Sequence, residues 1–132
     1  MNFRAFLLEQ TFYHGTTNGE ASLILQNGFD ISKYKSGTYE GIYLTPNINY
    51  FDDGRHPAIL KAEIDPKSIM DVKSVTESDL AQADPHYKMM SYGYRNHLVK
   101  QIALQRGFKA LKDGPQIILI DPSGVESVSR FK

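Results

Sequence analysis

The sequence predicts an α+β fold that is built mainly from strands. Short runs of aliphatic and aromatic residues recur along the chain, and glycine or proline ends most of them. Only the stretches around 19–27, 76–83 and 96–106 have helical spacing or a helical start signal. Because strands dominate and helices are few, the class indicated is α+β. At 132 residues, the chain is expected to form one domain over 1–132.

The first strand is expected around 11–15, and it leads into a helix around 19–27. Asn18 is the expected N-cap, and Gly28 can take the left-handed conformation that ends a helix. A polar loop then runs from Ser32 to Glu40. The apolar stripe expected on this helix consists of Ala21, Ile24 and Leu25.

The second half of the chain repeats this pattern of short strands and few helices. Thr76 and Asp79 have the spacing of a capping box, which predicts a short helix as far as Ala83. The segment 84–96 mixes aromatic residues, methionine and glycine, and its structure is not assigned. A helix is expected over 96–106, with Leu98, Val99, Ile102 and Ala103 as its buried stripe. Further strands are expected at 41–45, 57–65, 69–72 and 116–121, with 125–128 returning as a hairpin partner of the last.

Composition excludes several classes of function. The chain has 15 Lys and Arg against 15 Asp and Glu, so no extended basic face is expected for gripping nucleic acid. It has no cysteine, which rules out disulfides and fits a reducing compartment, and four histidines alone form no metal pattern. No apolar run reaches membrane-spanning length, and 1–8 is read as a packed terminal segment without a signal-peptide cleavage site. These features favour a cytoplasmic protein with no membrane partner and no metal.

The first motif of interest lies where the first strand ends. Successive strand side chains point to opposite faces, so His14 shares a face with Phe12 while Tyr13 points away. Gly15 follows directly and permits close approach of another group to the backbone. Such a histidine can donate a hydrogen bond to a ligand or accept one from it, although a structural histidine in the core is the commoner case.

A second motif lies in the strand 41–45. Ile42 and Leu44 can both face a core, which turns Tyr43 toward the other side. An aromatic ring on that side offers a flat surface for stacking. A hydrogen-bonding histidine, an accessible glycine backbone and a tyrosine ring together suit a ligand with a flat aromatic group.

In these segments the chain resembles the ADP-ribosyltransferase superfamily, in the His-Tyr-Glu branch that includes poly(ADP-ribose) polymerases and diphtheria-type toxins. It is similar to the small stand-alone members of phages and bacteria. The resemblance covers about half of the chain and implies two packed small β-sheets with a few flanking helices, a split β-sandwich that holds NAD in its cleft. The matching segments, in the family's order, are 13–16 with Ala21, Ile24, Gly28 and Phe29, then 41–45 with Asn49 and Tyr50, and then 116–121.

The resemblance also implies roles for individual residues. His14 would bind the adenosine-side ribose, the Gly15 backbone would hold the nicotinamide carboxamide, and Tyr43 would stack on the nicotinamide ring. Tyr50 is a candidate for a second wall beside that ring. Thr16 either adds a hydroxyl to the NAD site or only ends the strand. For Arg55, contact with the NAD pyrophosphate is weighed against a solvated loop position.

The chain departs from the family at the third catalytic position. A glutamate opens the corresponding strand in the family, whereas Gln116 stands here. A carboxylate favours the positive charge that builds on the anomeric carbon, and glutamine can orient the ribose but carries no charge. Three consequences stay open: transfer proceeds with less electrostatic help, another acid such as Asp113 substitutes, or only binding is retained.

The function expected from the resemblance is that of a mono-ADP-ribosyltransferase with NAD as co-substrate. The enzyme would cleave the nicotinamide–ribose bond and pass ADP-ribose to an acceptor macromolecule, with a protein favoured over a nucleic acid. The loops 32–40 and 84–96 are the segments expected to select the acceptor. A non-catalytic NAD-binding, ADP-ribose-binding or protein-interaction module is the alternative, and the neutral charge disfavours an RNA 2′-phosphotransferase.

Overall fold

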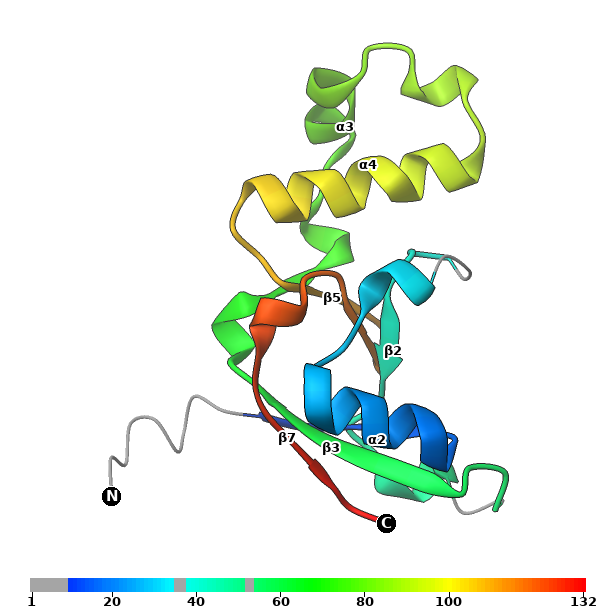
Figure 1. The fold of residues 1–132 in the computed structure, drawn as a ribbon. Coiled ribbons are helices and arrows are strands. Elements are labelled where there is room, and N and C mark those ends of the chain that lie inside the picture. Colours follow the sequence, from blue (N-terminus) through cyan, green and yellow to red (C-terminus); the bar gives the residue numbers. More distant parts are fainter. Residues whose placement is uncertain (1–9, 35–37, 52–53) are drawn as a thin grey trace.

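A computed structural model describes residues 10–34, 38–51 and 54–132, and within these ranges the chain is α+β, as the sequence predicts. The described residues form two small sheets and three α-helices (Figure 1). The expected terminal segment 1–8 and part of the loop 32–40 lie outside the described residues. The strands are β1 (Gln10–Thr16), β2 (Ile42–Leu44), β3 (Ala58–Ile64), β4 (Ile69–Asp71), β5 (Ala110–Asp113), β6 (Gln116–Leu119) and β7 (Val125–Arg130), and the α-helices are α2 (Asn18–Asn27), α3 (Glu77–Ala83) and α4 (Tyr92–Gln105).

The two sheets differ in size, and one backbone bridge links them. The three-stranded sheet has the order β1-β3-β7 and is antiparallel, whereas the four-stranded sheet has the order β2-β6-β5-β4 with a parallel β4–β5 pair. Tyr13 of β1 and Thr45 after β2 exchange two backbone hydrogen bonds, of 2.8 and 3.0 Å, and so join the edges of the two sheets. A cavity lies beside this bridge and is lined by residues from both edges.

One hydrophobic core lies between the sheets and beneath α2. Ile42 and Leu44 point into it from β2, and Phe12 points into it from β1, as the strand alternation predicts. Ala21 and Ile24 bury one face of α2 against the sheet, but Leu25 is 40% exposed and does not belong to the buried stripe. The second core lies under α3 and α4, which cover the other side of the four-stranded sheet (Figure 1). The predicted stripe of α4 is confirmed there: Leu98, Val99, Ile102 and Ala103 are all buried.

The strand pairing corrects one expectation. Residues 125–128 do not return beside 116–121, because the short helical turn at 122–124 carries the chain to the other sheet, where β7 pairs with β3. The hairpin partner of β6 is β5, which the sequence did not reveal, and the turn between them uses Gly114 at φ 60°. The predicted strand 116–121 is an interior strand of its sheet, although the ladder ends at Leu119.

The helix starts differ from the prediction in a similar way. The N-cap of α2 is Thr17 rather than Asn18, and the Thr17 hydroxyl accepts a hydrogen bond of 3.1 Å from the Glu20 N–H. Helix α4 begins at Tyr92, four residues before the expected start, because Ser91 caps it. The capping box that opens α3 at Thr76 is confirmed. Among the described residues, no helix is long and apolar enough to cross a membrane.

Candidate binding site between the two sheets

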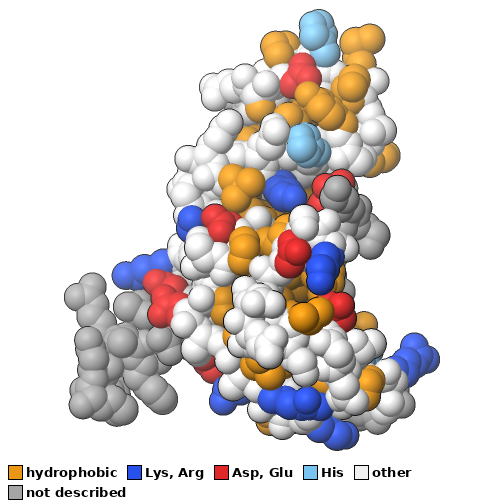
Figure 2. Space-filling model, in the orientation of Figure 1, with side chains coloured by type: hydrophobic (Ala, Val, Ile, Leu, Met, Phe, Trp, Pro, Cys, Tyr) orange, Lys and Arg blue, Asp and Glu red, His pale blue; other side chains and the backbone are white. Residues whose placement is uncertain are grey.

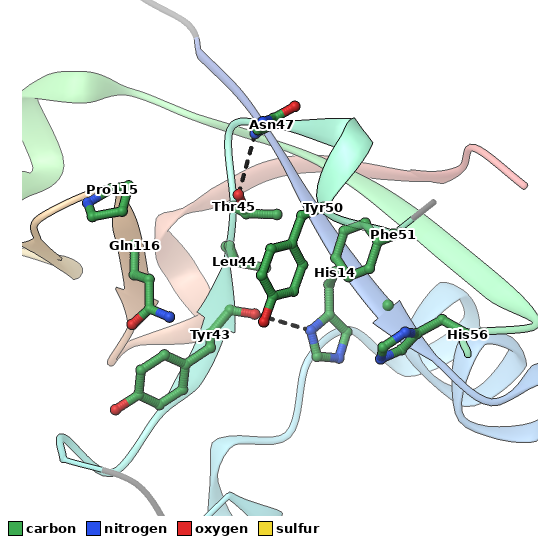
Figure 3. Close-up of a pocket in the computed structure, with 11 residues that line it drawn as sticks. His14, Tyr43, Leu44, Thr45, Asn47, Tyr50, Phe51, His56, Pro115 and Gln116 are labelled. Atoms are coloured by element: carbon green, nitrogen blue, oxygen red, sulfur yellow. Dashed lines mark hydrogen bonds between the residues drawn. The ribbon is translucent and has the colours of Figure 1, made fainter. Parts of the chain in front are cut away.

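A cavity of about 440 Å³ opens beside the Tyr13–Thr45 bridge, where the edges of the two sheets separate. In Figure 3, Tyr43 and Gln116 stand at one end of this cavity and His14 and His56 at the other, with Tyr50 between them. Its size is within the range of small-ligand sites. Its lining consists of His14, Gly15, Tyr43, Leu44, Thr45, Asn47, Tyr50, Phe51, His56, Pro115 and Gln116.

His14 is a buried histidine whose hydrogen bonding determines its tautomer. Its Nδ1 lies 3.1 Å from the backbone carbonyl oxygen of Tyr43, which can only accept, so Nδ1 carries the proton. In the neutral ring Nε2 is therefore an acceptor, and this atom is buried without a hydrogen-bond partner. Burial lowers the pKa of His14 below 6.5, the Tyr43 carbonyl opposes this shift, and the nearby His56 adds to it. The site thus presents an unpaired acceptor that suits a hydroxyl or N–H group of a ligand.

Gly15 directs its backbone toward the same opening. The N–H and C=O of Tyr13 both point away from β3, because they bond to Thr45 across the bridge. Two residues further along the strand, the N–H and C=O of Gly15 point to the same edge. The partner of Gly15 in the ladder is Ile59, which spends its own N–H and C=O on Lys132, in bonds of 3.0 and 3.1 Å on the far side. Gly15 therefore offers one donor and one acceptor along the open edge of β1.

Tyr43 is held at both ends. Its backbone belongs to β2, and its hydroxyl accepts a hydrogen bond of 3.1 Å from the Tyr39 N–H. The ring also packs beside the second hydrophobic core. A ring fixed in this way can serve as a stacking surface without a large loss of side-chain entropy when a ligand binds.

Gln116 is exposed at the start of β6 and has a carboxylate as its cross-strand neighbour. It pairs with Asp113 in the β5–β6 ladder, so the two side chains lie on one face of the sheet. This is also the face that carries Tyr43, since Tyr43 pairs with Ile118, two residues beyond Gln116. The charge of Asp113 reaches this region: burial raises the pKa of Tyr39 first, and Asp113 raises it further.

The structure brings together five of the residues singled out from the sequence. His14, Gly15, Tyr43, Tyr50 and Gln116 all line the cavity. The other two, Thr16 and Arg55, are not part of its lining.

Among the lining residues missed in the sequence are two with aromatic rings, Phe51 and His56. Their rings pack edge to face with centroids 5.2 Å apart, and both press against Gly15. The only sequence signal was the aromatic pair Tyr50-Phe51, followed closely by a histidine. This signal gives no indication that the segment folds back over the first strand.

The described residues contain no group of three or more histidine and acidic side chains that could hold a metal ion. No protein-family model and no curated protein sequence matches the chain. A solved structure described as the crystal structure of an anti-CRISPR protein has a similar fold, with a TM-score of 0.54 and 10% sequence identity over 94% of this chain and 96% of that one. At this identity the likeness concerns the fold alone.

Proposed function

We propose that the protein is an NAD-dependent mono-ADP-ribosyltransferase whose site is the cavity between the two sheets. The observation that carries the proposal is the convergence of His14, the open backbone edge of Gly15, and Tyr43 on one cavity. These groups come from two strands that are 29 residues apart at the His14–Tyr43 contact. Their order and types match the resemblance to the His-Tyr-Glu branch.

Each group suits a different part of NAD. The unpaired Nε2 of His14 can only accept, so a ribose hydroxyl is a fitting partner and an ionised phosphate is not. A primary carboxamide has both donors and an acceptor, which complement the C=O and N–H of Gly15. The nicotinamide ring would then lie against the fixed ring of Tyr43, with Tyr50 available as the second wall.

The chemistry requires positioning more than covalent participation. The nicotinamide–ribose C–N bond breaks and its electron pair leaves with nicotinamide, while an acceptor nucleophile attacks the anomeric carbon and loses its proton to water. Positive charge builds on the sugar during this step, and oriented oxygen atoms stabilise it. Gln116 supplies a neutral carbonyl oxygen at the end of the cavity where Tyr43 lies, with the Asp113 carboxylate as its neighbour in the ladder.

A protein acceptor is favoured by the surface of the α3–α4 region. Met89 and Tyr92 are 84% and 85% exposed, and Met90 is 51% exposed beside them. Figure 2 shows hydrophobic side chains gathered over this end of the molecule. Methionine and tyrosine are enriched in protein–protein interfaces, so the segment 84–96 is the proposed docking region for the acceptor.

The test is the release of free nicotinamide when the purified protein is incubated with NAD, followed by transfer of labelled ADP-ribose to a protein in a cell lysate. Release together with a labelled protein band supports the proposal. Release without labelling would support an NAD glycohydrolase instead. Absence of both NAD binding and nicotinamide release would overturn the proposal.

A non-catalytic module is the second candidate, and Gln116 is the observation that favours it. Without a carboxylate at this position the protein could bind NAD or ADP-ribose, or a partner protein, without cleaving a bond. The similar fold of an anti-CRISPR protein makes components of CRISPR systems reasonable partners to test in either case. If wild-type protein binds NAD but releases no nicotinamide, while the Gln116→Glu variant does, the natural protein is a binding module.

A further inference from the structure

The second histidine of the cavity, His56, has no assigned part in the proposed reaction. It lines the same cavity as His14, and Figure 3 shows the two imidazole rings beside each other. Its Nδ1 is buried and has no hydrogen-bond partner, as is also true of His14 Nε2. These are the two buried side-chain polar atoms without a partner in the part of the chain that the structure describes. The two residues that carry these atoms line one cavity.

The position of the His56 ring is fixed by its packing. The ring meets Phe51 edge to face at 5.2 Å, and it also lies against Gly15, where an added Cβ would stand 2.6 Å from two of its ring atoms. A ring packed in this way cannot leave without disturbing Phe51. Its unpaired nitrogen is therefore held in place before any ligand arrives.

Leaving a buried nitrogen without a partner costs stability, so native proteins pair such atoms or use them at functional sites. The two imidazoles are also close enough to interact electrostatically, because His56 contributes to the lowered pKa of His14. A ligand that forms a hydrogen bond with each nitrogen would remove the free-energy cost of both unpaired atoms. A pair of adjacent hydroxyl groups can donate or accept a hydrogen bond at each ring.

We propose that His56 is a second ligand-binding residue, which binds through Nδ1 the ribose hydroxyl adjacent to the one that His14 accepts. The ligand group is the cis-diol of the adenosine-side ribose of NAD, so the inference rests on the proposed function. Nε2 of His14 accepts a hydrogen bond from one hydroxyl, because the proton on Nδ1 is donated to the Tyr43 carbonyl oxygen. The neighbouring hydroxyl of the same ribose then reaches His56. Phe51 and Gly15 serve to hold the His56 ring in position.

Three substitutions separate binding from packing. His56→Phe keeps a ring against Phe51 and Gly15 but removes the nitrogen, so we expect the Kd for NAD to rise about tenfold with little change in Tm. His56→Asn keeps a polar atom near the Nδ1 position and should retain affinity within about threefold. His56→Gln places its amide near the Nε2 position and should bind as weakly as His56→Phe. His97→Ala, which removes an exposed imidazole outside the cavity, is the matched control and should leave the Kd unchanged.

Ligand analogues identify the contacted group. Isothermal titration calorimetry would compare NAD with analogues that lack the 2′- or the 3′-hydroxyl of the adenosine ribose. The analogue that lacks the contacted hydroxyl should bind wild type and His56→Phe with equal affinity, because neither protein can form the contact with His56. If NAD binds wild type and His56→Phe alike, or if His56→Phe retains affinity and His56→Asn loses it, His56 is a packing residue and the inference fails alone. If wild type binds no NAD, the inference fails together with the proposed function.

Discussion

Replacing Gly15 by alanine tests how closely the cavity wall is packed. An alanine Cβ would lie 2.6 Å from the His56 ring and 2.7 Å from Phe51 Cε1, which is well inside van der Waals contact. The backbone of Gly15 has no positive φ, so the expected effect comes from steric crowding and not from backbone strain. Both aromatic rings would have to move, and both line the cavity. Stability and ligand affinity should therefore fall together.

The size of the effect follows from the cost of inserting a methyl group into packed surroundings, which is about 1–3 kcal/mol. At about 2.1 cal/mol/K per residue, unfolding of 132 residues has an entropy of about 0.28 kcal/mol/K. Gly15→Ala should then lower Tm by about 4–11 °C. The Kd for NAD should rise by about tenfold or more, since the His56 ring is displaced from its position.

Gly19→Ala is the matched control, because Gly19 lies in α2 and an added Cβ there meets no atom within 4 Å. A helical glycine is less favourable than alanine by about 0.5–1 kcal/mol, so this variant should raise Tm by about 2–4 °C and leave NAD binding unchanged. The assays are thermal unfolding by circular dichroism and calorimetric titration with NAD. If Gly15→Ala unfolds at the wild-type temperature and binds NAD normally, the described packing of His56 and Phe51 over this strand is wrong.

Three further predictions concern the other end of the cavity and the pH dependence. Tyr43→Ala should weaken NAD binding by about 1–2 kcal/mol through lost stacking and buried area, and an unchanged calorimetric Kd would remove Tyr43 from the site. Gln116→Ala should reduce nicotinamide release by about 10–100-fold and Gln116→Glu should preserve or raise it, whereas equal rates in all three proteins would direct attention to an Asp113→Asn variant. Because the folded pKa of His14 lies below 6.5, the unfolded chain binds the proton first, so the His14 contribution to stability is complete above pH 6.5 and is lost as the pH falls through the folded pKa. NAD affinity should fall in the same acidic range, because a protonated Nε2 of His14 no longer accepts a hydrogen bond. A His14→Gln variant should lose the pH dependence both of the unfolding free energy and of the Kd for NAD.

Local patterns in the sequence predicted which side chains face inward. Strand alternation placed Phe12 and His14 on one face of β1 and set Tyr43 opposite Ile42 and Leu44, and both assignments are confirmed. The buried stripe of α4 followed from helical spacing. These features depend on residues only a few positions apart, so the information that determines them is contained in short segments.

The pairing of distant segments was decided by tertiary structure. The turn after Ile120 could have returned the chain beside β6, but the packed core leads β7 to β3, where Val125 pairs with Ile64. Likewise, nothing in the local pattern places His56 against Gly15, because this contact joins residues 41 positions apart and depends on the pairing of β1 with β3. Long-range contacts depend on which pairing of distant segments buries the most apolar area. A single stretch of sequence does not show which of the alternative pairings is more favourable. The sequence thus determined the residue types and facing directions of the candidate site, and only the folded chain made them into one cavity with two unpaired imidazole nitrogens.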